Sequence, residues 1–200
     1  MTGRILPRSF YRRPAVEVAR DLLGKTLVHG PAAGIIVETE AYLGAGDLAA
    51  HSAAGLTNRT EVIFGPPGHA YVYLSYGMHE CLNIVVEPEG KPGCVLIRAL
   101  EPVSGIELMR LRRPAAKTDR ELASGPGKLT RAMAITRAQN GVDVTSGELV
   151  VRAQKGGASF EIETTPRIGI TKSADLPLRF LIRGNGFVSQ NGNRWRARSG

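Results

Sequence analysis

The sequence lacks any apolar run long enough to span a membrane. Its first residues, 1–14, are too basic and too interrupted to resemble a signal peptide. We therefore expect a cytoplasmic protein, associated with the nucleoid if the source is bacterial. With 200 residues and 42% hydrophobic content, the chain can bury a substantial core. We expect a single domain over residues 1–200, in which residues 1–14 and 184–200 are loosely ordered ends.

Cysteine is also scarce, with only Cys81 and Cys94, both in apolar, strand-like surroundings. Neither has a metal-type partner at short spacing, and there is no clustered set of His, Cys and Asp elsewhere. We expect buried, reduced thiols, with a disulfide between them as the minor alternative. The sequence predicts neither a metal nor a cofactor.

Acidic residues are outnumbered, 18 against 26 basic ones, which gives a formal net charge of +8. Basic clusters occur at residues 4–13, 110–113 and 194–198. Such a balance favours a polyanionic partner, because neutralising phosphates releases counterions from nucleic acid. The alternative is that these clusters are ordinary solvated faces.

The most informative stretch is residues 35–44, Ile-Ile-Val-Glu-Thr-Glu-Ala-Tyr-Leu-Gly. Side chains alternate between the two faces of a strand, so Glu38, Glu40 and Tyr42 share one side. Burying a carboxylate without a partner costs free energy, so two carboxylates in this strand suggest a functional role. The competing interpretation is an exposed strand face with solvated charges.

The rest of the chain is rich in strand patterns. We expect helices at residues 15–23, 103–113, 118–123 and 127–135, with one helical turn at 47–51. Strands are expected at residues 25–28, 34–42, 93–100, 149–153, 160–164 and 178–182. The first two of these strands form a hairpin, and residues 4–13 are expected to be irregular.

A second predicted hairpin covers residues 69–86, turning at Gly77. This turn places Tyr76 and Met78 at a protruding tip, where a ring is hard to bury. We therefore expect Tyr76 to contact something flat, whereas Tyr71 is interpreted as plain sheet packing.

Two further features concern charge. Arg98 interrupts an apolar strand and needs an acidic or carbonyl partner, for which Glu40 is the obvious choice. Ser124-Gly125-Pro126-Gly127-Lys128 precedes a helix, so its backbone N–H groups and Lys128 are suited to an anion. The spacing is not that of a nucleotide P-loop. An ordinary capped helix start is an equal alternative.

Together these motifs resemble the alkyladenine (3-methyladenine) DNA glycosylase family. The resemblance is carried by residues 37–44 with Ala50-His51-Ser52, Tyr71-Val72-Tyr73 with Tyr76-Gly77-Met78, Cys81 and Asn83, and by residues 95–102, 124–129 and 166–169. It covers about residues 22–183. It implies an α+β fold, a single mixed domain with a curved antiparallel sheet and flanking helices. It also implies a monomeric enzyme that flips a damaged purine out of double-stranded DNA and hydrolyses its N-glycosidic bond, leaving an abasic site.

The resemblance also implies roles for individual residues. Glu40 would activate a water, which Arg98 and the backbone carbonyl of Ile168 would help to hold, while Glu38 would support them. The base pocket would comprise Tyr42, His51, Tyr73 and Asn83. Tyr76 and Met78 would form the DNA wedge, and Arg59 and Lys128 would contact phosphates. No lysine stands at the catalytic position, so strand cleavage is not expected.

Some points stay open. His79 and Glu80 depart from the family pattern, no general acid is evident, and the lesion range is not defined by the sequence. One alternative function is a non-catalytic nucleic-acid-binding module with a basic, aromatic sheet platform. Another is a helix-hairpin-helix glycosylase, suggested by Gly125-Pro126-Gly127 but opposed by the many strands.

Overall fold

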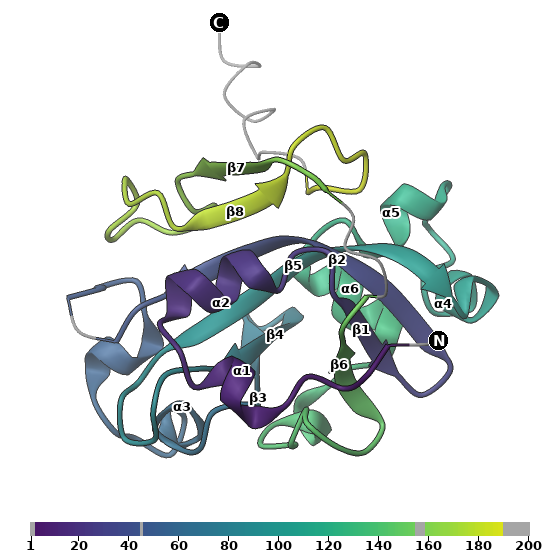
Figure 1. The fold of residues 1–200 in the computed structure, drawn as a ribbon. Helices are drawn as coiled ribbons and strands as arrows, with labels where there is room; N and C mark the ends of the chain where they lie inside the picture. Colours follow the sequence, from purple (N-terminus) through teal and green to yellow (C-terminus); the bar gives the residue numbers. More distant parts are fainter. Residues whose placement is uncertain (1–2, 45, 155–158, 190–200) are drawn as a thin grey trace, which may run out of the picture.

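A computed structural model describes residues 3–44, 46–154 and 159–189 of the chain. Within them the backbone forms one eight-stranded sheet, antiparallel at every pairing, with helices around it (Figure 1). The expected α+β fold on a curved antiparallel sheet is confirmed. The strands are β1 Thr26–His29, β2 Ala32–Tyr42, β3 Ala70–Ser75, β4 His79–Val85, β5 Cys94–Ser104, β6 Leu149–Arg152, β7 Ile162–Thr165 and β8 Arg179–Ile182.

The helices are short. They are α1 Arg8–Tyr11, α2 Ala15–Asp21, α3 Glu61–Phe64, α4 Ile106–Arg112, α5 Asp119–Ala123 and α6 Pro126–Met133, with 3₁₀ helices at His51–Ala54 and Arg137–Gln139. In the part of the chain that the structure describes, no helix combines the length and apolarity needed to cross a bilayer.

Strand β2 is the centre of the sheet, whose main order is β3-β4-β5-β2-β1-β6. One edge of β2 pairs with β5, and the other edge is shared by β1 and then β8. Glu38 and Glu40 lie in the half that pairs with β8, so strands flank them on both sides. In Figure 1 the β7–β8 hairpin lies at the top of the view, along this part of the sheet. The topology therefore buries both carboxylates.

The expected helix at residues 103–113 is partly wrong, because β5 continues through Ser104. The first residues of β2 offer a ladder partner there, with Gly34 opposite Pro102 and Ala33 opposite Ser104. Gly105, with φ of 68°, then ends the strand, and α4 begins at Ile106. Any Cβ at this glycine would lie 2.7 Å from the carbonyl oxygen of Pro31, so the tight crossing requires glycine.

Three other expectations need correction. The helical turn lies at His51–Ala54 instead of residues 47–51, because the Asp47 carboxylate caps the backbone N–H groups of Leu43 and Ala49. Helix α6 ends at Met133, where Ala134 adopts φ of 55°. Residues 4–13 are not wholly irregular, since they contain α1, and Tyr11 is fully buried. Both predicted hairpins are confirmed.

The core lies between the sheet and its helices. It combines residues from β2, β5 and β8 with the apolar faces of α2 and α6; its members include Leu22, Ile36, Ile97, Leu129 and Phe180. Burial of this surface, at roughly 25 cal/mol per Å² of apolar area, provides the main stabilising free energy. The site described below is built on this rigid sheet.

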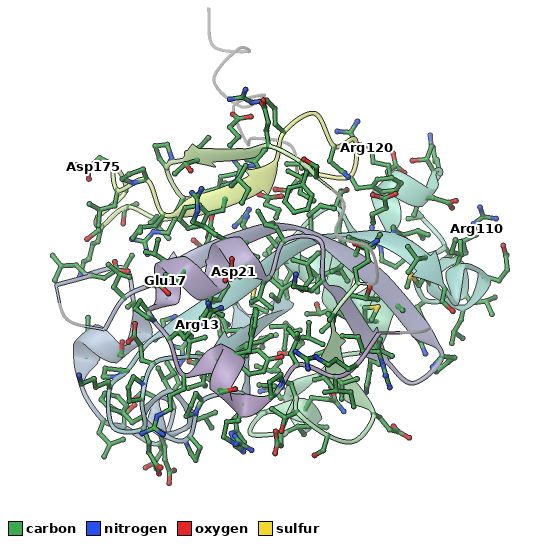
Figure 2. The ribbon with its side chains drawn as sticks, viewed as in Figure 1. Arg13, Glu17, Asp21, Arg110, Arg120 and Asp175 are labelled. Atoms are coloured by element: carbon green, nitrogen blue, oxygen red, sulfur yellow. The ribbon has the colours of Figure 1, made fainter. Side chains whose placement is uncertain are left out.

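In the two described basic clusters, three of the seven arginines form ion pairs with acidic neighbours. Arg8 pairs with Asp143, and Arg13 with Asp21. On α4, Arg110 projects outward from the ribbon (Figure 2) and pairs with Glu107 and Asp119. The cluster at residues 194–198 lies outside the described residues. Net charge alone therefore does not locate a nucleic-acid surface.

Candidate active site

Two carboxylates stand side by side near the end of β2, as the alternation of that strand predicts. Neither Glu38 nor Glu40 has any solvent-exposed surface. Leaving a charge in such a place without partners is costly, so the contacts of each carboxylate indicate what it is there for.

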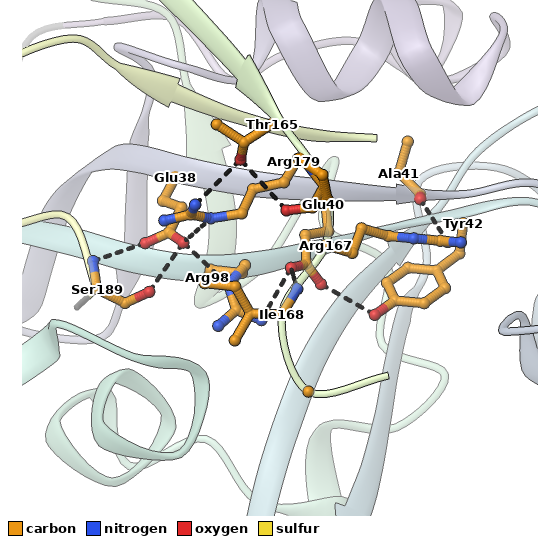
Figure 3. A network of polar contacts seen from close by, with 12 residues as sticks. Glu38, Glu40, Ala41, Tyr42, Arg98, Thr165, Arg167, Ile168, Arg179 and Ser189 are labelled. Atoms are coloured by element: carbon orange, nitrogen blue, oxygen red, sulfur yellow. Dashed lines mark hydrogen bonds and ion pairs between the residues drawn. The ribbon is translucent and has the colours of Figure 1, made fainter. Parts of the chain in front are cut away.

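Glu40 is held by three donors (Figure 3). Its Oε1 accepts hydrogen bonds from the backbone N–H of Ile168 at 2.8 Å and lies 3.1 Å from Nη1 of Arg98. Its Oε2 accepts from the hydroxyl of Tyr42 at 2.9 Å. The carboxylate is thus fixed in orientation by groups from β2, β5 and the segment before β8. Such fixation is what a catalytic base requires.

Glu38 comes two residues before Glu40 on β2 and binds two arginines, Arg98 and Arg179. Its Oε1 accepts from Nε of Arg98 at 3.0 Å and from Nε of Arg179 at 2.6 Å. The backbone N–H and hydroxyl of Ser189 donate to the same carboxylate at 2.7 and 2.8 Å. Arg98 therefore bridges Glu38 and Glu40, whereas the sequence suggested Glu40 alone.

A cavity of about 540 Å³ opens beside this network. That volume is typical of a small-molecule site. Most of the predicted site residues line it: Tyr42, His51, Arg59, Tyr73, Tyr76, Asn83, Arg98 and Ile168. Glu40, Met78 and Lys128 are not among the lining residues. Glu40 nevertheless contacts three that are.

Aromatic rings form one wall. His51 meets Tyr73 edge to face, with ring centroids 4.4 Å apart, and Tyr73 stacks on Tyr71 at 5.4 Å. Tyr71 is buried in the sheet as predicted, but it also lines the cavity and its hydroxyl lies 2.9 Å from Nδ1 of His51. Sequence reasoning missed this second role, since the His51 loop reaches Tyr71 only in the fold.

His51 is held as a neutral ring. Burial, aided by the charge of Arg59, lowers the pKa of His51 to about 4. Nη2 of Arg59 lies 3.4 Å from Nε2, and arginine can only donate, so Nε2 is the acceptor. The proton then sits on Nδ1 and is donated to Tyr71. The cavity thus presents an uncharged imidazole at neutral pH.

We expect His51 to titrate with a midpoint near pH 4 in the folded protein. Because this pKa lies below the unfolded value of about 6.5, the unfolded chain binds the proton first. Any stability that His51 confers is present above about pH 6.5 and is lost as the pH falls toward 4. Two-dimensional NMR of the ring protons measures the midpoint. A midpoint near 6.5 for His51 would contradict its described contacts.

Asn83 is buried at the floor of the cavity. Its Nδ2 donates to the carbonyl oxygen of Tyr71 at 3.2 Å, and Sγ of Cys94 lies 3.9 Å from its Oδ1. Cys81 and Cys94 both line the cavity, and both are buried and form no disulfide. Burial raises the pKa of Cys94 to about 12, so this thiol is no nucleophile at neutral pH.

The hairpin tip stands at the mouth of the cavity. Tyr76 and Met78 are 81% and 71% exposed, as the turn at Gly77 predicts. Tyr76 has φ of 49° and Gly77 has φ of 69°, a pair that fits a tight hairpin turn but is unusual for a bulky residue. The Tyr76 hydroxyl donates to the carbonyl oxygen of Gly169 at 3.1 Å. A strained, exposed ring over a cavity is typical of a functional position.

The structure shows where His79 and Glu80 lie, the two residues that depart from the family pattern. His79 lines the cavity and packs so closely on Gly127 that a Cβ there would lie 2.8 Å from the His79 side chain. Glu80 pairs with Arg137 at 3.3 Å, outside the cavity lining. Lys128 is exposed in the first turn of α6, next to the cavity residues Pro126 and Gly127.

A pair absent from the sequence reasoning also supports the site. Arg167 and Asp47 form a fully buried, two-pronged ion pair, with contacts of 2.6 and 2.8 Å. Arg167 directly precedes Ile168, whose N–H binds Glu40. The sequence did not predict this pairing because the two residues are 120 positions apart. Among the described residues, no group of three or more His, Cys, Asp or Glu side chains could hold a metal ion.

The comparison with known families decides the relationship. The model of the methylpurine-DNA glycosylase family matches residues 9–186 of the chain. The chain belongs to this family. The matched region contains every site residue that the sequence predicted, and a helix-hairpin-helix origin is not favoured.

Relatives of this glycosylase family match nearly the whole chain. A protein of Methanocella arvoryzae is 56% identical over 194 residues, covering 93% of this chain and 96% of its own. One from Koribacter versatilis is 53% identical over 191 residues, covering 92% of each chain, and one from Rhodopseudomonas palustris is 50% identical over 188 residues, covering 94% and 89%. All three bear the name "Putative 3-methyladenine DNA glycosylase".

Proposed function

We propose that this protein excises alkylated or otherwise damaged purines from double-stranded DNA, hydrolysing the N-glycosidic bond and leaving an abasic site. The observation that carries the proposal is Glu40, a fully buried carboxylate fixed by Arg98, Ile168 and Tyr42 beside an aromatic cavity. A stacking platform that only binds has no use for such a carboxylate. Family membership supports the same reaction class.

The reaction follows from the charges that develop. As the C1′–N bond breaks, its electron pair leaves with the base and positive charge builds on the sugar. Glu40 stabilises that charge and accepts a proton from the water that attacks C1′. Arg98 and the Ile168 N–H keep Glu40 in place, and the Ile168 carbonyl is proposed to hold the water. Among the described residues no lysine lines the cavity, so we expect no Schiff base at C1′ and a strand that stays intact.

The cavity selects the base by stacking and by exclusion. Alkylated purines are electron-poor and often cationic, so they stack well on the rings of Tyr42, His51 and Tyr73. The neutral state of His51 avoids repulsion of a cationic base. Asn83, whose amide is held by Tyr71, is proposed to reject the exocyclic amino group of guanine.

At the mouth of the cavity, Tyr76 and Met78 are proposed to fill the gap left by the flipped nucleotide. Inserted side chains offset the stacking that is lost, which costs a few kcal/mol per step. Entry of DNA would break the Tyr76–Gly169 hydrogen bond.

We propose that the protein acts as a monomer of one domain, in the cytoplasm or on the nucleoid.

Lys128 and Arg59 are proposed to hold phosphates. We expect Lys128→Ala to weaken binding to all DNA sequences alike and to reduce the slope of log Kd against log salt by about 0.9, that of one phosphate contact. Fluorescence anisotropy at several salt concentrations measures both effects. Lys91→Ala, which removes an exposed lysine that does not line the cavity, is the matched control. An effect restricted to one sequence or lesion would contradict a phosphate role.

The proposed function is tested by incubating the protein with oligonucleotides that carry one 7-methylguanine, ethenoadenine or hypoxanthine, in duplex and single-stranded form. Release of free base from a duplex substrate, faster than from its single strand, supports the proposal. Binding without release from any substrate would favour the alternative, a non-catalytic platform of tyrosines with a basic surround.

A further inference from the structure

The buried pair Arg167–Asp47 places a charge against the ring of Tyr42. The guanidinium carbon of Arg167 lies 4.6 Å from the centroid of that ring. Tyr42 lines the cavity, whereas Arg167 does not. The cation therefore lies behind the ring as seen from the cavity, and Figure 3 shows the two side chains together.

Asp47 neutralises this cation at close range. Both of its oxygens bind Arg167, and both side chains are fully buried. Burial by itself would raise the pKa of Asp47, but hydrogen bonds from Arg167, Leu43 and Ala49 outweigh it and lower that pKa. Arg167 is also fixed by donating to the carbonyl oxygen of Ala41 at 3.1 Å. The pair is thus ionised and held rigidly against one face of the ring.

We infer that the Arg167–Asp47 pair sets the preference of the cavity between cationic and neutral damaged purines. The inference rests on the proposed function, in which a base stacks on the open face of Tyr42. A ring attracts a cation through the negative charge of its face, and a second cation on the opposite face opposes this attraction. Asp47 cancels most of that opposition. Arg167 and Asp47 are positioning and specificity residues, since neither touches the base.

The consequences have opposite signs in two variants. Asp47→Asn leaves an uncompensated cation behind the ring, so it lowers the preference for a cationic base by about two- to tenfold. The double variant Asp47→Asn with Arg167→Met removes both charges. It therefore also removes the part of the opposition from Arg167 that Asp47 does not cancel, and it raises that preference by about two- to fivefold.

The test measures the Kd for duplexes containing cationic 7-methylguanine or neutral ethenoadenine, in a Glu40→Gln background that prevents turnover. The readout is the Kd for the ethenoadenine duplex divided by the Kd for the 7-methylguanine duplex, so a higher ratio means a stronger preference for the cationic base. Loss of packing alone weakens both complexes equally and leaves this ratio unchanged. If Asp47→Asn does not fold, as judged by circular dichroism, the double variant carries the test, because it leaves no unpaired charge at this position.

A ratio that falls in Asp47→Asn, or rises in the double variant, supports the inference. A ratio that stays at the parent value, even with weaker binding overall, overturns it. Base release by the unsubstituted protein is measured separately, so failure of the proposed function appears as no release. Failure of this inference appears only as an unchanged ratio.

Discussion

Replacing Glu40 with Gln should lower the single-turnover rate of base release by about 10²- to 10⁴-fold, the range of general acid–base catalysis. Glutamine keeps the shape of the side chain and an oxygen that can accept from Arg98 and Ile168. It cannot take a proton from water, and it carries no charge to stabilise the sugar cation. The loss should therefore fall on the chemical step.

Affinity for lesion-containing duplex should change little in Glu40→Gln, because the proposed contacts to the base come from other residues that line the cavity, Tyr42, His51, Tyr73 and Asn83. Gel shift and single-turnover assays separate the two effects. Glu148→Gln, a change at an exposed glutamate outside the cavity, is the control and should behave as the unsubstituted protein. Full turnover by Glu40→Gln would remove this residue from the catalytic role.

The largest effect on stability is expected for Glu38→Gln. The Glu38 carboxylate compensates the guanidiniums of Arg98 and Arg179, both of which are buried. Breaking a buried ion pair from one side typically costs about 3–5 kcal/mol. We therefore expect the free energy of unfolding to fall by about this amount, with a lower urea midpoint and an unchanged m-value.

An exposed pair of the same chemistry gives the comparison. Glu161 and Arg183 lie 2.6 Å apart with side chains 73% and 62% exposed. Because water screens such a pair, Glu161→Gln should change stability by only about 0–1 kcal/mol. Equal losses in Glu38→Gln and Glu161→Gln would show that the buried network contributes little to stability.

The sequence predicted those parts of the site that depend on local pattern. Alternation along β2 put Glu38, Glu40 and Tyr42 on one side, and Gly77 placed Tyr76 at a tip. A β-strand and a hairpin are decided by near neighbours, so these predictions were confirmed. The roles of the residues came from family resemblance, and they stay predictions that the variants above test.

The sequence could not show which distant groups meet. Ser189 donates to Glu38 across 151 positions, and the N–H of Ile168 reaches Glu40 across 128. Backbone donors carry no residue signature, so no pattern could reveal them. The continuation of β5 to Ser104 was missed for a similar reason, because tertiary pairing with β2 overrides local helix preference.

The most direct measurement of the central claim is product analysis of one turnover by the unsubstituted protein, with EDTA present and a duplex carrying a single 7-methylguanine. We predict free 7-methylguanine and a DNA strand that stays intact until alkali cleaves it at the abasic site. That result would establish metal-independent hydrolysis of the N-glycosidic bond. Stable binding of the duplex with no free base would contradict the account.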